Sequence, residues 1–329
     1  MPRGAAWAVR YRPRMRLASI HFYPVKSTSG HEVRRAVVEP WGLAGDRRFV
    51  VVGGDGKVLT ARTHARLLAC TARFDGPDGD ARAGGPLTGD ATTGGALAEA
   101  GAGAGTASAS ASASGALTLT GPHAAPLRVI PGGEPGRTGR RITVAYPKEV
   151  LDLADCGDAA AAWLSELLGE PVRLAWQDDP RGRPVDPLYS RPEDRVSLAD
   201  AYPLLLTTTA SLDRLNAWVA ETAAERGEEP RPPLSMRRFR PNVVIDGVAE
   251  PFDEDTWKRV RIGEVDFRVS KGCDRCVLPT IDPVTLAKGK EPTRTLARHR
   301  RWDGKVWFGV NLIPDGPGVL TQGDPVTVL

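Results

Sequence analysis

The sequence is short of cysteine, of long apolar runs and of excess charge, and each shortage removes a class of protein. Four cysteines in 329 residues are too few for a disulfide scaffold, so we expect a reducing cytoplasm. No run approaches the roughly eighteen apolar residues of a membrane-spanning helix. Because 44 basic residues stand against 40 acidic ones, the net charge of +4 is too small to indicate a nucleic-acid partner.

The composition that is present is typical of a globular protein with a sizeable core. Hydrophobic residues make up 41% of the chain and charged residues 26%. The length predicts two closely packed subdomains. Residues 1–15 form a basic extension without the apolar core of a secretory signal. Since ordered-looking sequence begins directly after Met15, we hypothesise that translation starts there rather than at Met1.

The first half of the chain reads as β structure interrupted by one insertion. "RLASIHFYPVKS" and "RFVVVGGDGKVLTA" cluster β-branched and aromatic residues around a Gly-Asp-Gly turn, which indicates strands and a hairpin. Residues 83–116 are nearly all Ala, Gly, Ser and Thr. Such a segment buries too little apolar surface to offset its ordering entropy, so we predict a disordered insertion between two strands.

Two helices and a series of short strands are predicted in the second half. Apolar residues at helical spacing predict a helix over 156–169, and a second helix is predicted over 211–224, capped by Thr209 or Ser211. The closing segments, such as "WKRVRIGEVDFRVS", are short, alternating and separated by turn residues. This pattern is typical of barrel strands.

The segment "SKGCDRCVLPTIDP" contains Cys273 and Cys276, and it allows several interpretations. A zinc site is disfavoured because neither a second Cys-x-x-Cys nor a His pair completes a four-ligand set. A thioredoxin-like pair is disfavoured because two prolines follow where a helix would have to begin. A thiolate flanked by Lys271 and Arg275 could instead bind a transition metal. On this segment alone, a buried structural cysteine is an equal alternative.

Four further segments place cationic or amide groups at strand ends. "YPVKSTSG" contains Lys26 and Ser27, "GLAGDRRF" contains Arg47, "FRPN" contains Arg240, and "FGVNL" contains Asn311. Such donors together with one thiolate would suit an anionic metal cofactor that carries a phosphate.

Taken in this order, the motifs resemble those of the MOSC family. The similarity is greatest to its amidoxime-reducing members of mitochondria and to bacterial molybdenum reductases of hydroxylamine-type substrates. It runs from about Arg16 to Leu329 and rests on "YPVKS", "GDRRF", "RFRPN", "CDRC…TIDP", "FGVNL" and "GDPV". The resemblance implies a β-rich α+β fold, with a MOSC N-terminal β-barrel-like region over 16–150. A C-terminal MOSC β-barrel with peripheral helices would follow over 151–329.

The resemblance also implies a set of site residues. Cys276 would be the protein ligand of the molybdenum in a molybdopterin-type cofactor, with Cys273 as a neighbour, and Asp200 would lie beside the cofactor as a second catalytic residue. Ala201 and Tyr202 depart from the small hydroxyl residues of the family at that loop. The implied cofactor-binding residues are Lys26, Ser27, Arg47, Arg240, Asn242, Asp274, Arg275 and Asn311.

The implied activity is the reduction of N-hydroxylated small molecules by a molybdenum-dependent oxidoreductase. With no cysteines left for an iron–sulfur cluster, electrons are expected from a separate flavin, ferredoxin-like or cytochrome-type protein. We predict no nucleic-acid partner and no membrane-spanning segment. The alternatives are a sulfur carrier or cofactor-transfer protein of the same superfamily, and a cofactor-binding protein that never turns over.

Overall fold

The computed structural model describes residues 14–75, 115–122, 124–131, 139–146 and 149–329. Within them lie nineteen strands and three α-helices, so the predicted β-rich fold class is confirmed. The predicted insertion 83–116 falls almost wholly on residues 76–114, outside the described part, and the extension 1–15 falls outside it up to residue 13. Both remain predictions.

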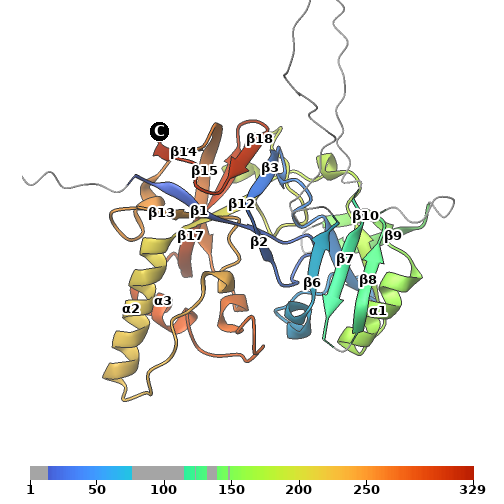
Figure 1. Ribbon diagram of the computed structural model, residues 1–329, viewed down its shortest axis with the longest axis horizontal. Coiled ribbons are helices and arrows are strands. Elements are labelled where there is room, and N and C mark those ends of the chain that lie inside the picture. The colour runs from blue at the N-terminus through green and yellow to red at the C-terminus, as the bar shows by residue number, and fades with distance from the viewer. Residues whose placement is uncertain (1–13, 76–114, 123, 132–138, 147–148) are drawn as a thin grey trace, which may run out of the picture.

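A large sheet forms the lobe on the left of Figure 1, which we call the C-terminal lobe. β1 (Arg16–Phe22), from the N-terminal end of the chain, joins this sheet by pairing antiparallel with β13 (Val243–Asp246). The order of the sheet is β19 (Val326–Val328), β14 (Arg259–Ile262), β15 (Val265–Asp274), β17 (Lys305–Pro314), β12 (Leu204–Thr208), β13 (Val243–Asp246), β1 (Arg16–Phe22) and β2 (His31–Val33), with β16 (Arg301–Trp302) on β17.

The opposite lobe, the N-terminal lobe, contains two smaller sheets. One has the order β5 (Phe49–Gly53), β11 (Val172–Trp176), β10 (Glu149–Asp155) and β9 (Arg141–Tyr146), and the other has β6 (Thr71–Phe74), β7 (Leu117–Gly121) and β8 (Ala124–Val129). A third small sheet joins β18 (Gly318–Thr321), β3 (Arg35–Glu39) and β4 (Gly42–Leu43). The proposed domain boundary between residues 150 and 151 lies within β10.

The helices pack outside the sheets (Figure 1). α1 (Asp158–Leu168) covers β11 and β8, while α2 (Thr209–Glu225) and α3 (Thr293–His299) cover the C-terminal lobe. The two predicted helices are present with slightly different ends, and α3 was not predicted. The predicted cap of α2 was wrong: the capping residue is Thr208, whose hydroxyl accepts a hydrogen bond from the backbone N–H of Ser211.

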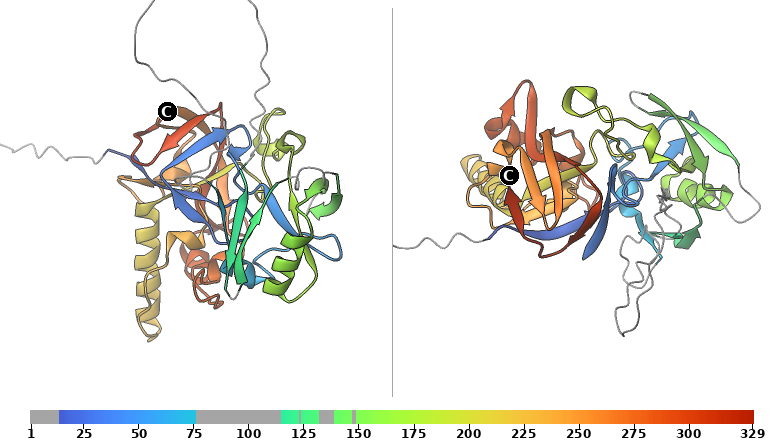
Figure 2. Two further views of the ribbon diagram at one scale, coloured as in Figure 1. Left: turned by 45° about the vertical axis from the view of Figure 1, so that its right-hand side comes forward. Right: turned by 90° about the horizontal axis from the view of Figure 1, so that it is seen from above.

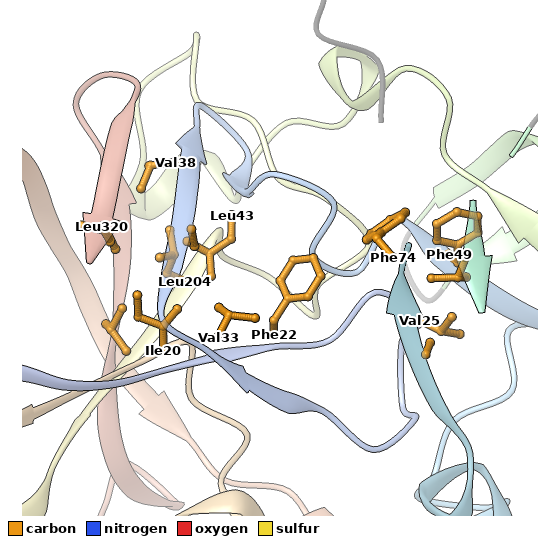
Figure 3. Packing of buried hydrophobic residues seen from close by; sticks show 14 of the residues in the cluster. Ile20, Phe22, Val25, Val33, Val38, Leu43, Phe49, Phe74, Leu204 and Leu320 are labelled. Atoms are coloured by element: carbon orange, nitrogen blue, oxygen red, sulfur yellow. The ribbon is translucent and has the colours of Figure 1, made fainter. Parts of the chain in front are cut away.

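One continuous apolar core joins the two lobes. Phe22 of β1 contacts Phe74 of β6, and Phe74 contacts Phe49 of β5, with ring centroids 6.1 and 6.3 Å apart (Figure 3). Figure 2 shows the lobes side by side, with the blue N-terminal strands reaching from one to the other. Because Phe22 and Phe49 are anchored in this core, the residues that follow β1 and precede β5 are held at the junction.

A buried carboxyl group lies at the N-terminus of α2. Glu254 is fully buried and accepts hydrogen bonds from the Ser211 hydroxyl at 2.7 and 2.9 Å and from the Thr208 hydroxyl at 3.2 Å. Burial raises the pKa of Glu254 to about 6, even though these hydrogen bonds act in the opposite direction. The folded state therefore binds this proton more tightly than the unfolded state, and stability falls as the pH rises through 4.5 to 6.

We expect Glu254→Gln to raise the free energy of unfolding at pH 7.5 by about 1–2 kcal/mol and to change it little at pH 4.5. Urea denaturation at the two pH values measures the difference. Glu228→Gln is the control of opposite sign, because Arg294 lowers the pKa of Glu228 to about 2, so this substitution should destabilise at pH 7.5. A Glu254→Gln variant that is less stable at pH 7.5 would show that the helix N-terminus stabilises the carboxylate after all.

Candidate active site

A cavity of about 310 Å³ lies at the junction of the two lobes. Backbone hydrogen bonds join the segment after β1 to the segment that leads into β5, from Lys26 N to Phe49 O (2.8 Å) and from Arg47 N to Tyr23 O (2.7 Å). All the residues predicted for the site line this cavity: Lys26, Ser27, Arg47, Asp200, Arg240, Asn242, Asp274, Arg275, Cys276 and Asn311. The structure thus brings them together, while their roles remain predictions.

Three of the lining residues have strained backbone. Ser27, Arg47 and Arg240 have φ values of 70°, 47° and 57°, in the left-handed region that non-glycine residues seldom adopt. Each such residue costs on the order of 1–3 kcal/mol, which the surrounding structure must offset. The concentration of this strain around one cavity indicates that the positions of these side chains matter for function.

A buried network around Asp46 fixes Arg47. The Asp46 carboxylate, 1% exposed, accepts hydrogen bonds from Tyr23 N (2.8 Å), Arg47 Nη1 (2.5 Å) and Asn242 Nδ2 (3.0 Å). Asn242 Oδ1 in turn accepts from Arg47 Nη1 (2.9 Å) and Leu205 N (3.2 Å). Burial would lower the pKa of Arg47, but the charge of Asp46 outweighs it and the pKa is raised. Because its amide is already engaged, Asn242 is better suited to positioning Arg47 than to binding a ligand.

Two guanidinium groups share the ring of Tyr23. The Cζ atoms of Arg47 and Arg240 each lie 4.3 Å from the ring centroid, which is a cation–π distance. Burial lowers the pKa of Arg240 to about 10, and the neighbouring charge of Arg47 acts in the same direction. Arg240 Nη1 donates to Thr28 O at 2.7 Å, whereas its Nη2 is buried without a partner in the described residues. This arrangement favours an additional negative charge.

Asp200 links two cations on another side of the cavity. Its Oδ1 accepts from Lys26 Nζ and its Oδ2 from Arg62 Nη2, each at 2.5 Å. Burial would raise the pKa of Asp200, but the charges of Lys26 and Arg62 outweigh it and hold the pKa well below its usual range. Although 61% of the side chain is exposed toward the cavity, both partners contact it directly. Asp200 is therefore a carboxylate at neutral pH and a poor proton donor.

The two cysteines of the pair have different surroundings. Cys276 is exposed in the cavity, and its Sγ accepts hydrogen bonds from Arg62 Nε at 3.4 Å and Leu278 N at 3.5 Å. Cys273, at the end of β15, accepts from Arg275 Nη1 at 3.0 Å, and burial raises the pKa of its thiol despite that charge. Both cysteines line the cavity, but Cys276 is the more exposed of the two, and they are not joined in a disulfide.

The expected pair of cations at the thiolate was partly wrong. Arg275 contacts the sulfur of Cys273 rather than that of Cys276, and Lys271 Nζ lies over the ring of Tyr189 at 4.6 Å. The cation at Cys276 is Arg62, which the sequence reasoning missed because it lies 214 residues away in "LTARTHARL" with no distinctive motif. Asp46 was missed as well, although it precedes Arg47 in "GDRRF".

Asn311 and Asp274 lie on strands of the C-terminal lobe, and Arg275 directly follows β15. Asn311 on β17 donates from Nδ2 to Gly272 O at 3.3 Å. Asp274, the last residue of β15, lies 3.3 Å from Lys305 Nζ. Arg275 donates from Nη2 to Phe239 O at 2.8 Å, but its Nε is buried without a partner in the described residues. Arg240 and Arg275 thus each keep an unused donor.

Comparison with known families finds two matching regions of the chain. Residues 193–327 match the MOSC domain, and residues 14–97 match the MOSC N-terminal beta barrel domain. The chain is a MOSC-domain protein. Cys276, Arg240 and Asp200 lie in its MOSC domain, whereas Lys26 and Arg47 lie in its MOSC N-terminal domain. Both MOSC regions therefore contribute to one cavity.

The relatives that match almost the whole of this MOSC protein include proteins named as amidoxime-reducing components. Mitochondrial amidoxime-reducing component 1 of Homo sapiens is 28% identical, over 98% of this chain and 87% of the relative, and the Mus musculus protein of the same name is 29% identical with the same coverage. Molybdenum cofactor sulfurase of Oryza sativa subsp. japonica is 28% identical over 90% of the chain, which spans only 32% of that longer protein. None of the helices in the described ranges is both long and apolar enough to cross a bilayer.

Proposed function

We propose that this protein binds a molybdenum–molybdopterin cofactor and reduces N-hydroxylated small molecules. The observation that supports it most is the cavity, in which one exposed thiol, Cys276, lies among five cations drawn from both MOSC regions. Relatives of similar length are named amidoxime-reducing. An amidoxime carries an N–OH group, and its reduction to N–H consumes two electrons and two protons and releases water.

The charges of the cavity fit an anionic, phosphate-bearing group. Lys26, Arg47, Arg62, Arg240 and Arg275 line it, against two carboxylates, Asp200 and Asp274. Arg240 Nη2 and Arg275 Nε are buried donors without partners in the described part of the chain. Since a buried donor without a partner costs roughly 1–3 kcal/mol, an oxyanion that accepts from these groups would be stabilised.

Cys276 is proposed as the protein ligand of the metal. A thiolate is a soft ligand that suits a transition metal, and this thiol faces the cavity beside the positive charge of Arg62. When bound, the cofactor supplies the two-electron redox chemistry. Lys26, Ser27, Arg47, Arg240, Arg275, Asp274 and Asn311 would hold the cofactor, and Asn242 would hold Arg47.

Asp200 is proposed to organise the site electrostatically. Its carboxylate holds Lys26 and Arg62 at opposite oxygens, so that Arg62 stays within reach of the Cys276 sulfur. The low pKa of Asp200 disfavours it as a source of protons at neutral pH. Catalysis by Asp200 remains a prediction, and the structure favours a positioning role. The electrons are proposed to come from a separate redox protein, and the cytoplasmic location also remains a prediction.

A sulfur-carrier or cofactor-transfer role is the second candidate. It is favoured by the molybdenum cofactor sulfurase relative and by the exposure of the Cys276 thiol, which would be the position for a carried sulfur. A carrier would bind the cofactor or the sulfur without turnover.

The protein produced in a molybdopterin-competent host is expected to contain about one molybdenum per chain, because it offers one thiol ligand, and to reduce benzamidoxime with dithionite-reduced viologen. Elemental analysis and product quantification measure the two properties. Molybdenum without turnover would favour the carrier, and a protein free of molybdenum would rule out both the reductase and a cofactor-transfer role.

A further inference from the structure

A second concave surface opens beside Cys276. We call it the basic groove; it has a volume of about 510 Å³, and it is bounded by Cys276, Val277, Lys288, Lys290, Arg294 and Ala297. It shares Arg275 and Cys276 with the cavity described above. A molecule whose reacting end lies beside Cys276 can therefore extend into this groove.

The groove has one apolar and one basic side. Val277, next to Cys276, and Ala297 on α3 offer aliphatic surface, whereas Lys288 and Lys290 lie in the exposed segment that precedes α3. A molecule with an apolar body and one anionic end would match this division, because the body would contact the aliphatic side and the anionic end would contact the basic side.

The cations of the groove differ in whether their charge is already balanced. Arg294 donates to Glu228 at 2.6 and 2.9 Å and to Glu291 at 2.5 Å, so its guanidinium is engaged. Lys288 and Lys290 have no ion-pair partner among the residues that the structure describes. Two unbalanced positive charges in one small groove attract an anion, and they act over the roughly 10 Å Debye length of 0.1 M salt.

We propose that the basic groove selects substrates that carry a carboxylate, with the N-hydroxylated end at Cys276, the apolar body on Val277 and Ala297, and the carboxylate at Lys288 and Lys290. This inference rests on the proposed reductase function and specifies its substrate class. Small neutral N-hydroxylated compounds are still reduced, but less efficiently.

The test compares benzamidoxime with 4-carboxybenzamidoxime, which differ by one carboxylate. With the molybdenum-loaded protein at low salt, kcat/KM is expected to be about tenfold higher for the carboxylate, as two surface charge interactions of about 0.7 kcal/mol each would produce. The advantage should disappear in 0.5 M NaCl and in Lys288→Ala/Lys290→Ala, while kcat/KM for benzamidoxime stays unchanged. Calorimetric titration without an electron donor should show the same loss of affinity for 4-carboxybenzamidoxime.

The control Lys57→Ala/Lys258→Ala removes the same charge from exposed positions outside the groove and should leave the ratio as in the wild type. Equal kcat/KM for the two compounds in the wild type, or a ratio that survives removal of Lys288 and Lys290, overturns the inference and leaves the reductase function intact. If neither amidoxime is reduced by molybdenum-loaded protein, the proposed function itself fails.

Discussion

Replacing Cys276 with serine is expected to remove molybdenum from the protein, whereas replacing Cys273 with serine is expected to leave it bound. Cys276 presents the exposed thiol of the cavity beside Arg62, and a hydroxyl is a much poorer ligand than a thiolate for a soft metal centre. Substitution of residues that only support a metal ligand lowers metal affinity roughly 10–100-fold, and the loss of affinity in Cys276→Ser should be larger than this. Molybdenum per chain, measured by elemental analysis of both variants, gives the result.

Cys273→Ser serves as the matched control because the Cys273 sulfur accepts a hydrogen bond from Arg275 Nη1 and donates one to Asp274 O, and a serine hydroxyl can do both. Thermal unfolding of both variants checks that a loss of molybdenum does not come from misfolding. Equal molybdenum in Cys276→Ser and the wild type, or equal loss in both variants, would contradict the asymmetry between the two cysteines.

Asp46→Asn is expected to cost about 3–5 kcal/mol of stability, the range for breaking one side of a buried ion pair. Arg47 Nη1 and Asn242 Nδ2 donate to Oδ2 and Tyr23 N donates to Oδ1, so in either orientation the asparagine amide would place a donor against another donor. Arg47 would then be buried without its counter-charge, and its side chain should be held less firmly in its position at the cavity. Urea denaturation measures the stability, and elemental analysis of the same preparation should show reduced molybdenum.

Asp75→Asn is the control for this substitution, since it also removes a carboxylate from an arginine pair. Asp75 contacts Arg128 at 2.6 Å, but both side chains are substantially exposed, so the cost should stay below about 1 kcal/mol. The network around Asp46 would be shown unimportant if the two variants lost similar amounts of stability.

Much of the architecture was predictable because it depends on local patterns. Alternating β-branched residues predicted strands, apolar residues at helical spacing predicted α1, and both α1 and α2 were predicted to within two residues at each end. α3 escaped prediction because its seven residues, Thr293–His299, are too short to show a periodic stripe. The cap of α2 was misplaced by one or more residues because Thr208, Thr209 and Ser211 all have the side chain that a cap requires.

The sequence by itself determined which residue types could form the site: an unpaired Cys-x-x-Cys followed by prolines, and cations at the ends of strands in motifs resembling those of MOSC proteins. Only the tertiary structure decided which cation faces which thiol. Arg275, next to Cys276 in the chain, contacts Cys273, and Arg62, from the other end of the sequence, contacts Cys276. The reason is physical: the contact between Arg62 and Cys276 depends on how the two lobes pack through Phe22, Phe74 and Phe49, and contacts across such a junction leave no pattern in the neighbouring sequence.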